Sequence, residues 1–430
     1  MNKSMLNRES IKQILLEQRL AFLNKETGIR RSVIESIESK LHLPHIHVIT
    51  GIRRCGKSTL LRQVAREFYN DEAFFYINFE DERLINFNPQ DFNDFYEVLV
   101  ELFGVKKTFL IDEVQHVRNF DSFIRRFYDN GFKFFITGSN AGLLKEEIST
   151  RLTGRHIDSY LTPFSFKEFL DYHQFSLTAE SIHISEKKAR IKSLFQEYFV
   201  SGGMPEFVRY KDTEILRHIY DDIVTKDIFI RNKVENVILG KELYRFLISN
   251  FAQRFSYNSL LKYIPLGSVN TIKRYVHFLE DVYLALLVSK FDYSVKKQFA
   301  NEKKLYITDN GFIRVLSIKP GADQGWLLEN LVRNNLSFAE EVFYYSGKKE
   351  CDFVLMNNKK VGSAIQVSMT LDRTNKDREI KGLLEAMGYF NLKEGLLLTF
   401  DQDGSEDIQG RHIMIKPVWK FLLEGQVGTT

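Results

Sequence analysis

Cysteine and proline are scarce in this sequence of 430 residues, which contains two cysteines and seven prolines. Two cysteines cannot form a disulfide framework, so we expect a chain that folds in a reducing compartment, the cytoplasm. Long apolar runs are missing too, since no stretch reaches the ~18 uninterrupted apolar residues that a membrane span requires. Residues 1–10 are polar and show no signal peptide. We therefore expect no membrane partner.

Neither sign of charge dominates. Lys and Arg number 60 and Asp and Glu 56, a net charge of +4 that is too small to indicate nucleic-acid binding on its own. Apolar residues make up 44% and charged residues 27%, as in ordinary globular proteins, so disorder and fibrous repeats are excluded. At about 100–200 residues per domain, the length predicts two to four domains.

The first third of the chain alternates between helical and extended patterns. Apolar residues recur at helical spacing in residues 8–43, and a strand follows Pro44. Three more buried strands, separated by helices, predict a parallel sheet covered on both faces. The four strands are expected at 45–50, 74–79, 108–111 and 133–137.

A glycine-rich loop lies between the first expected strand and a helix. It matches the pattern G-x(4)-G-K-[ST], in which backbone N–H groups surround phosphate oxygens at a helix N-terminus. Lys57 is expected to reach the β- and γ-phosphates of ATP, and Ser58 to ligate Mg²⁺. A purely structural glycine turn is the alternative. The predicted nucleotide-binding residues are Gly51, Ile52, Arg53, Arg54, Cys55, Gly56, Lys57, Ser58 and Thr59.

Further catalytic candidates follow the third and fourth strands. Asp112 is expected to hold Mg²⁺, and Glu113 to orient and deprotonate the attacking water; a solvated strand end is the alternative. Asn140 is expected to touch the γ-phosphate or the water, unless it belongs to an ordinary turn. Arg155 is expected to reach the nucleotide of a neighbouring copy in a homo-oligomer, with a merely solvated arginine as the alternative.

Cys55 lies among the amides that are expected to face phosphate. Positive potential at this position is expected to lower the pKa of the thiol. Alkylation of Cys55 would then block ATP binding. The alternative is that Cys55 is a small buried filler.

Together these motifs resemble the AAA-type ATPase domain of a large prokaryotic family, in which a P-loop ATPase precedes a C-terminal domain of unassigned function. That family is similar to archaeal-type ATPases and to signal-transducing STAND NTPases. The resemblance implies a lid turn at 202–205 whose Pro205 approaches the nucleotide; a simple helix break is the alternative. The motifs that carry the resemblance lie at 50–58, 110–115, 137–140, 152–155, 161–169, 225–228, 305–311 and 351–355.

The middle of the chain predicts a helix–turn–helix. Residues 257–263 and 268–275 have helical periodicity, with Ser268 as the N-cap of the second helix. Two strand-like stretches after it, at 285–289 and 303–307, would complete a winged helix. In such a module Asn270, Lys273 and Arg274 would contact DNA. A dimerisation or lid element is the alternative.

The last hundred residues resemble the core of PD-(D/E)xK nucleases. Glu329 on a helix and Asp352 on a hairpin strand occupy acidic positions of that pattern. Gln366, however, stands where the pattern has an acid, and Ser368 where it has a lysine. Because metal-assisted hydrolysis needs anionic ligands and a cation or base near the water, we expect a nuclease-like fold without nuclease activity. An unrelated α/β domain with solvated acids is the alternative.

The sequence thus predicts an α/β protein: a P-loop NTPase with a parallel sheet, a helical lid, a winged helix and a nuclease-like C-terminal domain. The expected function is hydrolysis of MgATP to ADP and phosphate, coupled to movement of the winged-helix and C-terminal domains, with DNA as a candidate partner. The alternative is a nucleotide-gated regulatory or DNA-binding switch with little turnover. The expected domains are N-terminal helices at 1–43, the ATPase core at 44–155, the lid at 156–236, the winged helix at 237–318 and the nuclease-like domain at 319–430.

Overall fold

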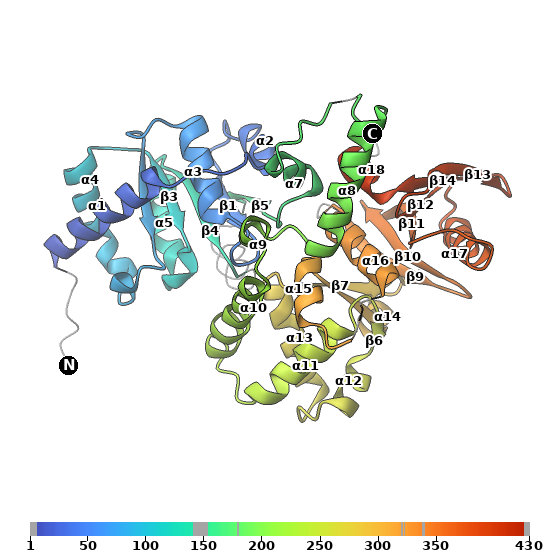
Figure 1. Cartoon of the computed structure of the whole chain (residues 1–430). Coiled ribbons are helices and arrows are strands. Elements are labelled where there is room, and N and C mark those ends of the chain that lie inside the picture. Colours follow the sequence, from blue (N-terminus) through green and yellow to red (C-terminus); the bar gives the residue numbers. More distant parts are fainter. Residues whose placement is uncertain are drawn as a thin grey trace. The chain divides into compact units, whose positions relative to one another are not determined.

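The computed structural model (Figure 1) describes residues 7–140, 154–178, 180–319, 321, 323–337 and 340–424. The chain divides into two compact units. The first comprises Met1–Thr162 and Asp281–Tyr283, and the second Pro163–Glu280 and Leu284–Thr430. Among the described residues, we find no helix with the length and apolar character needed to cross a membrane.

The first unit is built on a parallel sheet of five strands in the order β2-β3-β4-β1-β5, which confirms the predicted parallel sheet. The fifth strand was not expected, because 156–160 was assigned to the helical lid. It pairs with the first strand in register from Ile46 and His156 to Thr50 and Tyr160, so the predicted end of the core at 155 is too early. The strands are β1 (Ile46–Thr50), β2 (Phe74–Asn78), β3 (Thr108–Asp112), β4 (Lys133–Gly138) and β5 (His156–Tyr160).

Helices cover both faces of this sheet. The helix α3 (Lys57–Phe68) packs against β3 and β4, while α4 (Phe92–Phe103) and α5 (Phe120–Asp129) contribute to the buried cluster on the other face. The helix α1 (Arg8–Asn24) adds three apolar residues to the same cluster, so the N-terminal helices belong to this unit instead of forming a domain of their own. The remaining short helices of the unit are α2 (Val33–Glu38), η1 (Glu82–Leu84), η2 (Pro89–Asp91) and η3 (Val114–His116).

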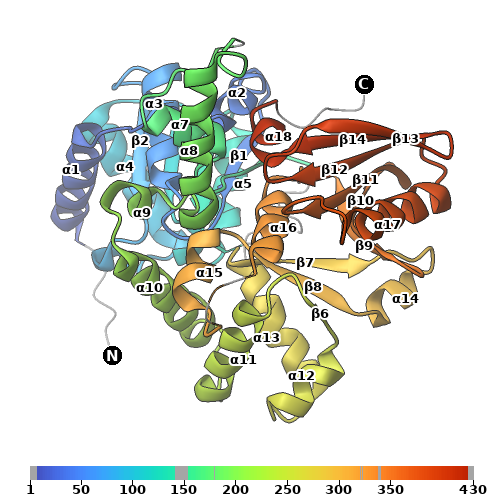
Figure 2. The ribbon, with the colours of Figure 1, turned by 45° about the vertical axis from the view of Figure 1, so that its right-hand side comes forward.

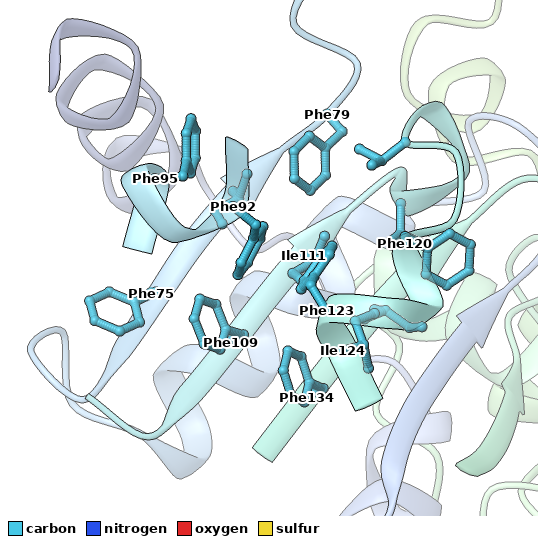
Figure 3. Close-up of a cluster of buried hydrophobic side chains, with 14 of the residues drawn as sticks. Phe75, Phe79, Phe92, Phe95, Phe109, Ile111, Phe120, Phe123, Ile124 and Phe134 are labelled. Atoms are coloured by element: carbon cyan, nitrogen blue, oxygen red, sulfur yellow. The ribbon is translucent and has the colours of Figure 1, made fainter. Parts of the chain in front are cut away.

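Aromatic rings fill the space between the sheet and these helices (Figure 3). Phe92 of α4 stacks on Phe123 of α5 with ring centroids 3.6 Å apart. On the sheet, Phe109 of β3 stacks on Phe134 of β4 at 5.2 Å. Close packing of this kind fixes the neighbouring strands β3 and β4, whose ends carry the acidic and polar residues of the candidate site.

The second unit begins with helices between residues 166 and 230, inside the range 156–236 that was expected to be a helical lid. The last of these is α-helical only in its first part and continues as a π-helix from Ile223. The bounds are α7 (Phe166–Tyr172), α8 (Ser185–Ser201), α9 (Pro205–Tyr210), α10 (Thr213–Asp222) and the π-helix η4 (Ile223–Ile230).

The two helices of the predicted helix–turn–helix are present at the expected positions. Ser268 Oγ accepts a hydrogen bond from Thr271 N at 3.1 Å, which confirms the predicted N-cap. The two strands after it pair antiparallel, as expected for a wing, but a short helix lies between them. The elements are α11 (Val237–Ser249), β6 (Arg254–Phe255), α12 (Tyr257–Tyr263), α13 (Val269–Asp281), β7 (Ala285–Lys290), α14 (Val295–Ala300) and β8 (Lys303–Ile307).

A nine-stranded sheet runs through the second unit (Figure 2), in the order β13-β14-β12-β11-β10-β9-β7-β8-β6. The strand β7 pairs in parallel with β9, with Ser289 opposite Phe343. The predicted boundary between 318 and 319 therefore does not separate two compact domains. The C-terminal elements are α15 (Asn310–Leu316), α16 (Gln324–Asn334), β9 (Glu341–Ser346), β10 (Glu350–Asn357), β11 (Lys360–Ser368), α17 (Lys376–Tyr389), β12 (Glu394–Thr399), β13 (Gly404–Ile408), β14 (Arg411–Pro417) and α18 (Val418–Glu424).

The turn between α8 and α9 is fixed by a buried carboxylate. Asp309 accepts hydrogen bonds from Gly203 N at 2.6 Å and from Gly311 N at 2.8 Å. Burial raises the pKa of Asp309 to about 6, against the opposing effect of the backbone hydrogen bonds. A Cβ atom at Gly203 would lie 2.2 Å from the carbonyl oxygen of Phe164, so only glycine fits.

We expect Gly203→Ala to destabilise the second unit by about 1–3 kcal/mol, because the clash is with backbone and cannot be relieved by a side-chain rotation. Both tryptophans of the chain, Trp326 and Trp419, lie in this unit, so denaturant unfolding followed by tryptophan fluorescence measures the change. Gly362→Ala, which places its Cβ in open space, is the control and should shift stability by less than about 0.5 kcal/mol. Equal midpoints for the two variants would mean that the turn accommodates a methyl group, contrary to the expected clash.

Candidate active site

The loop between β1 and α3 adopts a backbone conformation that needs glycine. Gly56 has φ +104°, and Arg54 is also left-handed with φ +65°. A Cβ at Gly51 would lie 2.2 Å from the carbonyl oxygen of Leu161, directly after β5. The loop is thus confined between its own turn and the neighbouring strand, in the strand–loop–helix context that the motif requires.

A buried arginine braces this loop from outside the motif. Arg31 donates to the carbonyl oxygen of Cys55 at 2.8 Å and to that of Thr162 at 2.7 Å. Its backbone N–H donates to Gln63 of α3 at 3.1 Å. Arg31 was not predicted as a site residue, because it lies between two helices and no local pattern marks it.

Lys57 and Glu113 form a buried ion pair, with Nζ 3.5 Å from Oε1. The ammonium also donates to the carbonyl oxygens of Gly51 at 3.2 Å and Ile52 at 3.3 Å. Burial, the largest single effect, would lower the pKa of Lys57, but the charges of Glu113, Cys55 and Asp112 and the hydrogen bond to Glu113 together raise it. Burial pushes the pKa of Glu113 up, yet Lys57 and a hydrogen bond from Gln115 bring it below its ordinary value. The pair is therefore charged.

The two predicted magnesium ligands are neighbours. The Ser58 hydroxyl is hydrogen-bonded to the Asp112 carboxylate, which also accepts from Thr137 Oγ1 at 2.5 Å and from the Tyr76 hydroxyl at 3.4 Å. Burial raises the pKa of Asp112, the charge of Glu113 adds to this effect, and the hydrogen bonds from Ser58 and Thr137 oppose it. A hydroxyl and a carboxylate are oxygen ligands of the kind that Mg²⁺ prefers, so the residues present fit this ion.

Glu113 is held in an uncommon backbone conformation. Its φ of +51° lies in the left-handed region, which costs about 1–3 kcal/mol for a residue other than glycine. Its N–H donates to Thr137 Oγ1 at 2.9 Å, and its carboxylate accepts from Gln115 Nε2 and from Ser139 Oγ, the latter at 3.2 Å. Backbone strain of this kind, supported by several contacts, is typical of functional positions.

Gln115, Thr137 and Ser139 were not predicted as site residues. The sequence predicted a polar contact after the fourth strand, at Asn140, and this residue is buried at the end of β4. Asn140 keeps its expected role as a prediction.

The other residues of the predicted loop set have identifiable contacts. Ile52 is buried, and Arg54 is exposed. Arg53 pairs with Glu80 at 2.5 Å. Thr59 accepts a hydrogen bond from Arg62 within α3 at 2.9 Å, so its hydroxyl is engaged inside the helix.

The prediction that Cys55 has a thiol of lowered pKa is wrong. The side chain is fully buried, and burial raises the pKa of the thiol even though Lys57 and Arg31 lower it. Desolvation outweighs the positive potential of the loop, because the thiol has no contact with solvent. The alternative of a small buried filler fits the structure.

Arg155 does not lie in the site of its own chain. Its carbonyl oxygen accepts from Ile46 N at the start of β1, the edge of the sheet opposite the loop, and its guanidinium pairs with Asp129 at 2.8 Å. The expected action on a neighbouring copy stays a prediction. Residues 152 and 153 of the same motif lie outside the described residues. Pro205 begins α9 in the second unit, and its expected approach to nucleotide also stays a prediction.

Sequence comparisons identify known relatives. A model described as an AAA domain matches residues 44–170, and a domain of unknown function (DUF8612) matches residues 192–322. The uncharacterized protein MJ1544 of Methanocaldococcus jannaschii is 35% identical over 436 residues, which cover 96% of this chain and 96% of the relative. An uncharacterized protein of Haemophilus influenzae is 29% identical over 392 residues, 87% of this chain and 94% of the relative.

Solved structures show more distant likenesses. The ORC1 protein of Aeropyrum pernix, solved in complex with DNA, is 12% identical with a TM-score of 0.30, over 74% of this chain and 96% of that chain. The RuvB Holliday junction branch migration motor of Thermotoga maritima is 15% identical with a TM-score of 0.30, over 65% and 89%. Structural similarity with a TM-score of 0.30 does not assign a family, so the family assignment rests on the sequence matches. The chain belongs to the family of AAA-domain proteins that includes MJ1544 of Methanocaldococcus jannaschii.

Proposed function

We propose that the first unit binds MgATP and hydrolyses it to ADP and phosphate. The observation that carries this proposal is the meeting of Lys57, Ser58, Asp112 and Glu113 at one edge of the parallel sheet, where Lys57 pairs with Glu113 and Ser58 with Asp112. A lysine, a hydroxyl and two carboxylates are the groups that phosphoryl transfer to water requires.

Lys57 is the group that changes partner in this proposal. Its ammonium is paired with one carboxylate and two carbonyl oxygens, and the phosphates of ATP offer it stronger anionic partners. Ser58 and Asp112 would hold Mg²⁺, which supplies charge neutralisation on the phosphate oxygens. The hydrogen bond between Ser58 and Asp112 shows that their oxygens are close enough for both to offer ligands to one ion.

Glu113 is the proposed general base. Once Lys57 turns to phosphate, the carboxylate loses its nearest cation, and its pKa rises towards a value suited to accepting a proton from water. Gln115 and Ser139 keep the carboxylate in place during this change, because both contact the same oxygen, Oε2. The strained backbone of Glu113 holds the side chain at the strand end throughout.

Binding of DNA by the helix–turn–helix is proposed as a second function. Residues 237–318 contain 12 Lys and Arg against 6 Asp and Glu, a net charge of +6, whereas the whole chain carries only +4. The remainder is therefore slightly acidic, and the excess positive charge is confined to this module. Asn270, Lys273 and Arg274 are all exposed on α13, as a phosphate-contacting helix requires.

The nuclease-like part of the second unit is proposed to lack phosphodiesterase activity. Gln366 lines the same cavity as Glu329 and Asp352 but contributes a neutral amide. Ser368 donates its hydroxyl hydrogen bond to the carbonyl oxygen of Thr370 at 2.9 Å and supplies no positive charge.

Two variants separate binding from hydrolysis. Lys57→Ala should weaken ATP binding about 10- to 100-fold, because it removes a charged donor to phosphate. Glu113→Gln should retain ATP binding but slow phosphate release about 10²- to 10⁴-fold, because the base is lost. Fluorescent-nucleotide titration and a multiple-turnover phosphate assay measure the two effects.

The matched control is Glu97→Gln, an exposed glutamate on α4, which should behave as the wild type. Undiminished nucleotide affinity in Lys57→Ala would contradict the proposed site. Tight binding by the wild type without repeated turnover would instead favour the nucleotide-gated switch.

The double variant Lys273→Ala/Arg274→Ala should weaken binding to a fluorescent duplex and reduce the slope of log affinity against log salt by up to about 2, because each lost phosphate contact contributes about 0.9. Lys188→Ala/Arg190→Ala removes one lysine and one arginine from exposed positions on α8 and is the control. Equal salt slopes for the two double variants would exclude α13 as the contact.

Wild-type protein is expected to leave supercoiled plasmid intact in Mg²⁺ or Mn²⁺, because the cavity lacks the acid at 366 and the lysine at 368. Agarose electrophoresis of the plasmid over time measures nicking. Metal-dependent nicking by the wild type that disappears in Asp352→Ala would overturn the proposal of inactivity.

A further inference from the structure

A lysine in the second unit is buried among three carboxylates. Lys304 of β8 is 3% exposed, and its Nζ lies 2.8 Å from Glu329 of α16, 2.7 Å from Glu350 of β10 and 3.6 Å from Asp352 of β10. All four side chains line a cavity of about 1080 Å³. No sequence pattern predicted Lys304, because β8 is separated from both acidic elements along the chain.

The carboxylates around this ammonium also accept hydrogen bonds from other donors. Glu329 Oε1 also accepts from the Tyr306 hydroxyl at 2.6 Å, and Asp352 Oδ2 accepts from Val367 N at 2.9 Å. Glu350 pairs in addition with Arg254. The oxygens that a divalent cation would need are therefore engaged by ammonium, hydroxyl, amide and guanidinium donors.

Another acid that lines the cavity, Glu379, is also engaged by other side chains. Glu379 accepts from Gln366 Nε2 at 2.7 Å and pairs with Arg378. Gln366 Oε1 in turn accepts from Asp352 N at 3.3 Å. Among the described residues, no group of three or more acidic, histidine or cysteine side chains is arranged to hold a metal ion.

We propose that the ammonium of Lys304 takes the position of a divalent cation in this cavity and closes it to divalent metals. The ammonium links β8 to α16 and β10 through its ion pairs, so the negative charges of the buried acids are partly balanced without a metal. Lys304 and its carboxylates belong to the second unit alone, so the proposal does not rest on ATP hydrolysis by the first.

The electrostatics of the cluster agree with this assignment. Burial would lower the pKa of Lys304, but Glu329 and Asp352 outweigh it and raise the pKa, so the side chain is charged. Burial, followed by the charge of Glu329, raises the pKa of Asp352 to about 7 although Lys304 opposes the shift. One ammonium thus compensates the acids incompletely. Its removal would leave three carboxylates without the cation that they share, which favours uptake of another cation.

Manganese binding to the nucleotide-free full-length protein tests the proposal. In titrations followed by electron paramagnetic resonance of free Mn²⁺, the wild type should show no binding that depends on Asp352, so wild type and Asp352→Asn should give the same isotherm. Lys304→Met, which keeps the length of the side chain without its charge, should gain one Mn²⁺ site. That site should disappear in Lys304→Met/Asp352→Asn. Lys304→Arg retains the positive charge and should gain no site.

Thermal unfolding provides an independent readout through the fluorescence of Trp326, which lines the same cavity. Lys304→Met should unfold several degrees below the wild type and recover on addition of Mn²⁺, since a ligand that binds only the native state raises the midpoint. The wild-type midpoint should not respond to Mn²⁺ more than that of Asp352→Asn does.

Two results would overturn the proposal. One is binding of Mn²⁺ to the wild type that Asp352→Asn abolishes, and this comparison does not depend on whether Lys304→Met folds. The other is a folded Lys304→Met protein that gains neither a Mn²⁺ site nor thermal stability from Mn²⁺.

Discussion

The candidate active site depends on one constraint, that the carboxyl ends of parallel strands lie at the same edge of a sheet. The central order β3-β4-β1 places three such ends side by side. Lys57 follows β1, Glu113 follows β3 and Ser139 follows β4, so residues far apart in sequence meet at one point. The aromatic packing beneath β3 and β4 keeps this edge rigid, which matters because Glu113 holds a strained backbone conformation there.

The parts of this arrangement that sequence predicts are those with a local signal. Apolar strands alternating with helices indicated the parallel sheet, and the spacing of glycines before Lys57 indicated the loop. The strand β5 was missed because its residues, His156–Tyr160, mix polar and apolar side chains and lie at the start of the segment that was expected to be the helical lid. The hydrogen bond of Ser139 to Glu113 depends on β4 lying beside β3, which periodicity alone does not fix. Arg31 carries no local pattern at all. For Cys55, the positive potential was anticipated but burial was not, and burial decides the direction of the pKa shift.

Both units contain a lysine that is buried against carboxylates, Lys57 and Lys304, and the two differ in the number of acids around them. Lys57 faces one carboxylate at 3.5 Å and otherwise backbone carbonyl oxygens. An incoming anion can therefore compete for it. Lys304 faces three carboxylates, two of them within 2.8 Å. Its charge is held from several sides, so it acts as a fixed structural ion. The same side chain thus serves an exchangeable role in one setting and a permanent one in the other.

The parallel pairing of β7 with β9 has a mechanical consequence for the second unit. The backbone hydrogen bonds between these strands join the predicted helix–turn–helix to the C-terminal strands. Any movement of one segment against the other would first have to break the pairing of β7 with β9. The two segments therefore belong to one sheet and are expected to move together. The chain passes between the two units at Thr162/Pro163, Glu280/Asp281 and Tyr283/Leu284, all of them outside this sheet.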